Sequence, residues 1–168
     1  GRPKVDDAPR ATPAGGGGSF KGVTVVGAKY GVDSRLTGSS PTFVAMTLLN
    51  QSCAGWLHGS LSTMTATGVR VSGAPAIAGV VAGVDPAAFG VAACATPVAP
   101  GSYRKTGRFD PRALLHSSAS LVDSSLHMTA APGRAAPPCV VANSSLYLSD
   151  VLASGCRQAV LSGGRAPL

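Results

Sequence analysis

From residue 67 the chain reads Thr67-Gly-Val-Arg-Val-Ser-Gly-Ala-Pro-Ala-Ile-Ala-Gly-Val-Val-Ala-Gly-Val84. In its first part Val69 and Val71 alternate with an arginine and a serine, which is typical of a half-buried β-strand. A glycine and a proline then turn the chain, and a small, continuously apolar run follows. This stretch therefore predicts a strand, a turn and a second strand.

Similar short runs recur on both sides of this stretch, separated by turn residues at a spacing of about 8–15 residues. Glycine (22 residues) and proline (13 residues) are frequent enough to supply these turns. No internal repeat is evident, and the spacing favours an antiparallel eight-stranded jelly-roll sandwich with one or two short helices in its connections. We expect strands near residues 23–29, 42–50, 67–72, 77–84, 88–96, 121–130 and 139–148, and a short helix at 110–116.

The composition is consistent with one all-β domain. The chain has 168 residues, and its seven acidic residues are all aspartates. Because glutamate favours helix interiors and aspartate does not, a helical bundle is disfavoured, and catalysis by paired glutamates is excluded. We expect a flexible basic arm at residues 1–20, a jelly-roll shell domain at 21–160 and a tail at 161–168. The predicted core comprises Val69, Val71, Leu126, Met128, Val141 and Leu148.

The net charge of +7 suggests a polyanionic partner. The arm is either a disordered tail or a segment that binds RNA through charge alone. A basic loop near residue 104, flanked by aromatic residues, is either solvated or a second phosphate-contacting surface. The candidate nucleic-acid-binding residues are Arg2, Lys4, Arg10, Lys21, Arg104, Lys105 and Arg108.

The four cysteines lie far apart in the sequence and lack the C-x₂-C spacing of a zinc site. We expect them to be small, reduced core residues, with disulfides as the alternative. The three histidines are also far apart, and no G-x-S-x-G motif occurs. We therefore expect no enzyme activity, no cofactor and no metal. No apolar run reaches the ~18–20 residues that a membrane span needs.

The order of features in residues 41–86 resembles the coat proteins of small icosahedral plus-strand RNA plant viruses, of the tymovirus-like and tombusvirus-like type. An apolar strand ends in Leu-Leu-Asn50, an alternating strand follows at Val69-Arg-Val71, and a proline-containing turn leads to Gly79-Val-Val-Ala-Gly-Val-Asp85-Pro86. Residues 123–148 resemble the last two strands of such a coat. The arm is less basic than in many of these proteins, and the protruding domain of tombusviruses is missing.

The resemblance implies a structural capsid protein that self-assembles into an icosahedral shell of many copies. The shell would enclose viral RNA without sequence specificity, would involve no membrane, and would assemble in the host cytoplasm. The alternative is a secreted β-sandwich binding or adhesion module with disulfides and with glycans at Asn50 and Asn143, which begin N-x-S sequons. A hydrolase is a third possibility.

Overall fold

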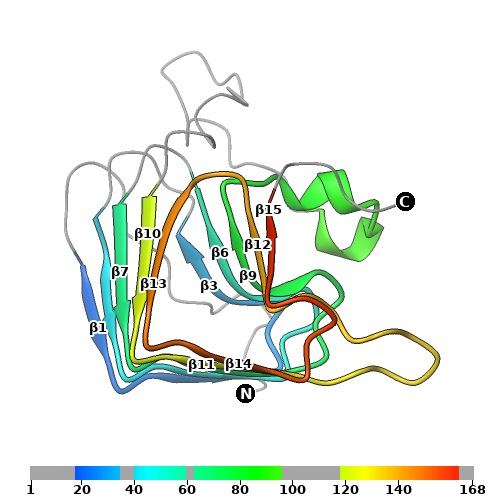
Figure 1. Cartoon of the computed structure of the whole chain (residues 1–168), viewed down its shortest axis with the longest axis horizontal. Helices are drawn as coiled ribbons and strands as arrows, with labels where there is room; N and C mark the ends of the chain where they lie inside the picture. The colour runs from blue at the N-terminus through cyan, green and yellow to red at the C-terminus, as the bar shows by residue number, and fades with distance from the viewer. Residues whose placement is uncertain (1–17, 35–39, 60–62, 96–117, 163–168) are drawn as a thin grey trace, which may run out of the picture.

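The computed structural model describes residues 18–34, 40–59, 63–95 and 118–162. These residues form a β-solenoid of about five coils, and every strand pair is parallel (Figure 1). Each coil contributes one strand to each of three five-stranded sheets. Successive coils therefore stack so that each strand pairs with its equivalent in the next coil.

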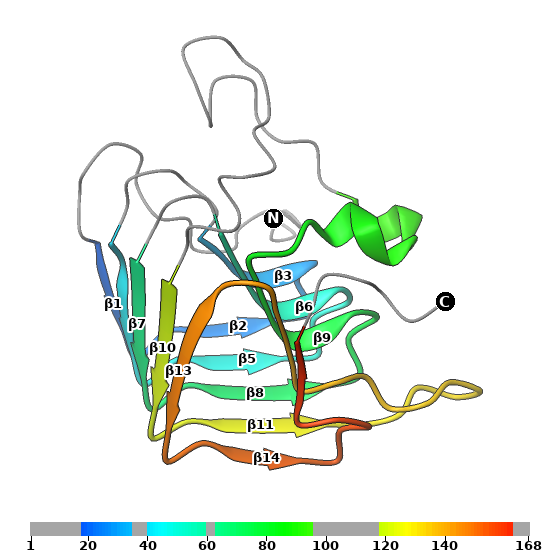
Figure 2. The ribbon, with the colours of Figure 1, turned by 45° about the horizontal axis from the view of Figure 1, so that its top comes forward.

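Sheet 1 contains β1, β4, β7, β10 and β13, sheet 2 contains β2, β5, β8, β11 and β14, and sheet 3 contains β3, β6, β9, β12 and β15. The strands of sheet 2 run side by side in Figure 2. The bounds are β1 (Ser19–Lys21), β2 (Thr24–Val26), β3 (Tyr30–Ser34), β4 (Thr42–Val44), β5 (Thr47–Leu49), β6 (Ala54–His58), β7 (Thr63–Thr67), β8 (Arg70–Gly73), β9 (Ala78–Ala82), β10 (Ser118–Val122), β11 (Ser125–Met128), β12 (Val140–Ala142), β13 (Ser145–Ser149), β14 (Leu152–Ser154) and β15 (Val160–Ser162).

Apolar side chains stack in columns inside the solenoid. In sheet 2, Val25 pairs with Leu48 and Leu48 with Val71, each 23 residues after the one before. In sheet 1 the ring of Phe20 stacks on that of Phe43 with 5.1 Å between centroids. The Phe43 ring also meets the fully buried Trp56 edge-on at 4.5 Å. This interior packing between coils holds the three sheets together.

The chain turns from sheet 1 to sheet 2 at a single left-handed residue in every coil. The residues at this corner are Gly22, Ala45, Gly68, Asp123 and Asp150, with φ between 48° and 66°. Glycine, and to a lesser degree aspartate, adopts this conformation more readily than other residues. A corner of this kind lets two short strands follow each other at an angle without a long loop.

The predicted antiparallel jelly roll is wrong, because all three sheets are parallel. Short, alternating strands separated by turn residues are common to both architectures, and only the pairing differs. The predicted strand at 42–50 is in fact two strands, β4 and β5, on either side of the corner at Ala45. The predicted strand at 88–96 is also wrong, because the described residues there form the 3₁₀ helices η1 (Pro86–Phe89) and η2 (Ala92–Cys94).

The core prediction is largely confirmed. Leu148 is the exception, since it is 36% exposed on the last coil, where no further coil packs against β13. The predicted helix at 110–116 lies outside the described residues. The confirmed core residues are Val69, Val71, Leu126, Met128 and Val141.

The prediction of reduced cysteines is also wrong. Cys53 is bonded to Cys94, and Cys139 is bonded to Cys156. The partners are 41 and 17 residues apart in sequence, but coil stacking and the connections between coils bring their Cα atoms to 5.5 and 5.3 Å. These separations are normal for disulfides.

Candidate functional site

Two segments interrupt the regular coil, and both lie beside sheet 3. The first follows β9 and includes the 3₁₀ helices η1 and η2. The second, residues 129–139, joins β11 to β12 and projects from the solenoid (Figure 1). Insertions on one side of a solenoid frequently form its binding face. The outer face of sheet 3 is therefore the candidate binding face.

The first insertion is fastened firmly to sheet 3. The Asp85 carboxylate accepts a hydrogen bond from the backbone N–H of Ala87 at 2.9 Å and caps η1. Cys94 at the end of η2 is bonded to Cys53, and the Cys94 carbonyl accepts a hydrogen bond from the Tyr30 hydroxyl. The Lys29 ammonium donates to the Ala95 carbonyl at 3.1 Å. These contacts fix η1 and η2 against the outer face of sheet 3.

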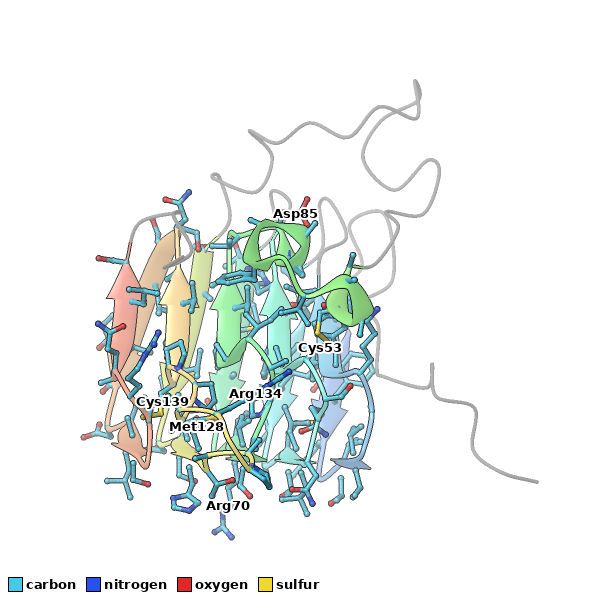
Figure 3. The ribbon with its side chains drawn as sticks, turned by 90° about the vertical axis from the view of Figure 1, so that its right-hand side faces the viewer. Cys53, Arg70, Asp85, Met128, Arg134 and Cys139 are labelled. Atoms are coloured by element: carbon cyan, nitrogen blue, oxygen red, sulfur yellow. A yellow bond between two sulfur atoms is a disulfide. The ribbon has the colours of Figure 1, made fainter. Side chains whose placement is uncertain are left out.

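The second insertion is held at both ends. At its start the backbone N–H of Thr129 donates to the Gly73 carbonyl at 2.8 Å. At its end Cys139 is bonded to Cys156, and the Arg157 N–H donates to the Pro137 carbonyl at 3.2 Å. Figure 3 shows this loop with Arg134 on it and with Cys139 and Met128 close by.

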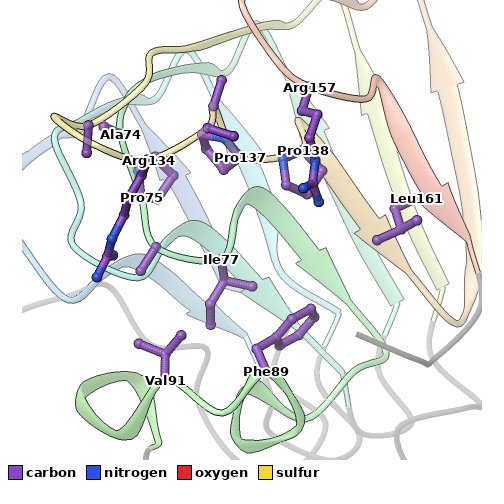
Figure 4. A pocket seen from close by; sticks show the side chains of 14 residues that line it. Ala74, Pro75, Ile77, Phe89, Val91, Arg134, Pro137, Pro138, Arg157 and Leu161 are labelled. Carbon is purple, nitrogen blue, oxygen red and sulfur yellow. The ribbon is translucent and has the colours of Figure 1, made fainter. Parts of the chain in front are cut away.

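Between the two insertions lies a pocket of about 290 Å³, called here the insertion pocket. Its apolar wall includes Ile77, which is 4% exposed, and Phe89 and Val91 from the first insertion. Pro137 and several alanines of the second insertion line the other side (Figure 4). Most of these lining side chains form no hydrogen bonds, but backbone groups and two arginine side chains also face the pocket, so it suits a ligand that has both apolar and polar parts.

Two arginines are the charged residues of the lining. Arg134 comes from the second insertion and Arg157 from the segment between β14 and β15. In Figure 4 Arg157 ends beside Pro138, and Arg134 lies at the other end of the pocket, beside Pro75, with its guanidinium directed away from Arg157. Among the described residues no acidic side chain lines the pocket, and neither guanidinium forms an ion pair there. The pocket thus combines an apolar body with uncompensated positive charge.

Of the residues predicted from the sequence to bind nucleic acid, the structure describes only Lys21. Lys21 is exposed on β1 in sheet 1, and sheet 3 carries the pocket. The other six, Arg2, Lys4, Arg10, Arg104, Lys105 and Arg108, lie outside the described residues. Sequence reasoning missed Arg134 and Arg157. The proline-rich segment containing Arg134 was recognisable as an insertion, but nothing in the sequence related it to Arg157.

A buried serine–histidine pair lies inside the solenoid. The Ser34 hydroxyl oxygen is 2.9 Å from His58 Nδ1 and accepts a hydrogen bond from Trp56 Nε1 at 3.1 Å. His58 Nε2 lies 2.9 Å from the Ser118 carbonyl, which makes it the donor of that hydrogen bond. Ser34 and His58 are fully buried, with 0% exposure. Their geometry fits a role in joining β3, β6 and β10.

The part of the chain that the structure covers offers neither a metal site nor a membrane-spanning helix. It holds no group of three or more histidine, cysteine or acidic side chains able to bind a metal ion. Nor does it hold a helix long and apolar enough to cross a bilayer.

Comparison of the chain with protein-family models, with curated proteins and with solved structures gives no match. The insertion pocket, with its apolar wall and its two arginines, is therefore the candidate functional site.

Proposed function

We propose that this protein is a ligand-binding module of an oxidising compartment, and that its insertion pocket takes a small, largely apolar molecule. One observation carries the proposal: the two walls of an apolar pocket are each fastened by a disulfide. Cys94 lies three residues after the lining residue Val91, and Cys139 and Cys156 directly adjoin the lining residues Pro138 and Arg157.

The disulfides support the compartment. All four cysteines of the chain are paired, which is typical of secreted and other extracytoplasmic proteins. This favours the secreted binding module over the cytoplasmic coat protein, although the module is a solenoid and not the β-sandwich expected from the sequence.

The fastened walls also support binding. A pocket that is already in its binding conformation avoids the entropy cost of ordering its walls when the ligand arrives. Proline at positions 75, 137 and 138 further stiffens the lining. The volume of about 290 Å³ is close to the lower end of the ~300–1,000 Å³ range of ligand pockets, so a small molecule fits it.

The chain offers a sharp test, because Ile77 is its only isoleucine and lines the pocket. A sample with labelled isoleucine and methionine methyl groups reports on the pocket through Ile77. The three methionines, which are Met46, Met64 and Met128, are buried in the solenoid interior and report on the core.

We expect medium-chain apolar probes such as decanol to shift the Ile77 methyl resonance saturably while the three methionine resonances stay in place. The shift should weaken in the Val91→Asp variant, which alters the pocket wall but keeps the Ile77 reporter, and also when both disulfides are reduced. Probes that leave Ile77 unchanged, or that move the methionine resonances equally, would contradict the proposal.

The coat-protein function stays a prediction. The predicted jelly-roll fold, on which this function partly depended, is wrong. The residues expected to contact RNA lie mostly outside the described ranges.

A further inference from the structure

We infer that the insertion pocket selects amphipathic anions: molecules with an apolar body and one carboxylate, of the medium-chain fatty-acid type. This rests on the proposed function and adds the chemical class of the ligand. The apolar body would lie against Ile77, Phe89 and Val91, and the carboxylate would face Arg157, with Arg134 adding positive charge at the other end of the same wall.

The charge balance of the pocket carries the inference. The part of the lining that the structure describes holds two guanidinium groups and no carboxylate. The four described aspartates, Asp33, Asp85, Asp123 and Asp150, all lie outside the lining. The nearest to the insertions in sequence, Asp85, already accepts the capping hydrogen bond of η1. A ligand carboxylate would thus meet positive charge with no competing acid in the lining.

The chemistry of the two side chains fits a carboxylate. The planar guanidinium presents parallel N–H donors that match the two carboxylate oxygens. Arg134 and Arg157 are both exposed, so a bound anion stays partly hydrated and avoids the cost of full desolvation. A neutral ligand of the same length would gain only the apolar contacts, and a cation would be repelled.

The position of the arginines gives the ligand a direction. They lie at the two ends of the wall formed by the second insertion and the β14–β15 segment, a wall that also holds Pro137 and Pro138, while Phe89 and Val91 stand on the opposite wall, which carries no charged side chain (Figure 4). A molecule with one apolar end and one anionic end matches this division, and a uniformly apolar or a uniformly charged molecule does not.

The test compares three probes of equal chain length, decanoate, decanol and decyltrimethylammonium, on the oxidised full chain with the Ile77 methyl group as the reporter. We expect decanoate to bind about tenfold more tightly than decanol, as one partly exposed charge-assisted contact allows, and the ammonium probe to bind most weakly. The preference for decanoate should shrink as the salt concentration rises.

Three variants assign the effect to residues. Arg157→Gln should weaken decanoate binding by about three- to tenfold, Arg134→Gln should weaken it by less, and both should leave decanol binding unchanged. Arg70→Gln is the matched control, since Arg70 is an exposed arginine on β8 in sheet 2. Unchanged fluorescence of the buried Trp56 would show that each variant is folded.

The outcomes separate this inference from the proposed function. Equal affinity for decanoate and decanol, or an equal loss of decanoate binding in Arg70→Gln, overturns the anion selectivity while the pocket remains a binding site. Absence of any Ile77 shift with all three probes overturns both.

Discussion

Replacing Gly55 by alanine should destabilise the solenoid sharply, because at Gly55 two coils leave no room for a side chain. A Cβ atom at Gly55 would lie 2.3 Å from Val71 Cγ1 and 2.7 Å from the carbonyl oxygen of Gly79 in the next coil. The Val71 side chain can move only at the expense of the interior packing, and the Gly79 carbonyl belongs to the backbone of β9. The added methyl group must therefore push β6 away from β9.

The size of the effect follows from these contacts. Overpacking of a well-packed interior costs about 1–3 kcal/mol. Lengthening the hydrogen bonds between β6 and β9 adds about 1 kcal/mol for each bond lost. We expect a loss of about 3 kcal/mol in the free energy of unfolding. For a chain of this size that corresponds to a fall in Tm of roughly 6–12 °C.

Gly22→Ala is the matched control. A Cβ atom at Gly22 meets nothing within 4 Å, and the equivalent corner of the second coil already holds Ala45 at a φ of 52°. This variant carries the conformational cost of a left-handed alanine without a steric clash, about 1 kcal/mol. Both variants can be followed by urea unfolding with the fluorescence of Trp56, the single tryptophan. If Gly55→Ala is no less stable than Gly22→Ala, the close approach of the coils is not what requires glycine here.

The remaining predictions concern the second disulfide, the core and the coat-protein function. Changing both Cys139 and Cys156 to serine should cost about 3 kcal/mol of stability for a bridge spanning 17 residues, measured by urea unfolding, and a change below 1 kcal/mol would contradict this. Leu126→Ala should lower the free energy of unfolding by about 2–5 kcal/mol, because Leu126 is fully buried. Leu148→Ala on the open last coil should lower it by less than about 1 kcal/mol. Equal losses in the two variants would show that the core does not end before Leu148. The coat-protein prediction expects uniform spheres by negative-stain electron microscopy and nuclease-protected RNA in them, and a monodisperse small species without RNA would count against it.

The local part of the fold could be predicted from the sequence. The alternation at Val69 and Val71 correctly indicated one buried face, since a strand exposes its two faces in turn whatever its partner is. The all-β class likewise follows from short apolar runs, frequent turn residues and the absence of glutamate. The corner at Gly68 was not predicted, because the expected strand at 67–72 ran through it.

The partner of each strand could not be predicted in this way. In a parallel solenoid a strand pairs with its equivalent one coil later, so Leu48 pairs with Val71 and not with a residue across a hairpin. Equivalent positions 23 residues apart hold different side chains, as at Val25, Leu48 and Val71. Because these apolar residues differ in identity, they give only a weak repeat in the sequence.

The candidate site depends on the tertiary structure almost entirely. The sequence by itself determined that the chain is all-β, basic and rich in turns, and it contained the proline-rich insertion that carries Arg134. Only the stacking of coils decided that Arg134 and Arg157 line one pocket and that the cysteines pair as they do. The physical reason is that a solenoid brings together residues a full coil or an insertion apart, and such contacts depend on register between coils, which no short stretch of sequence records.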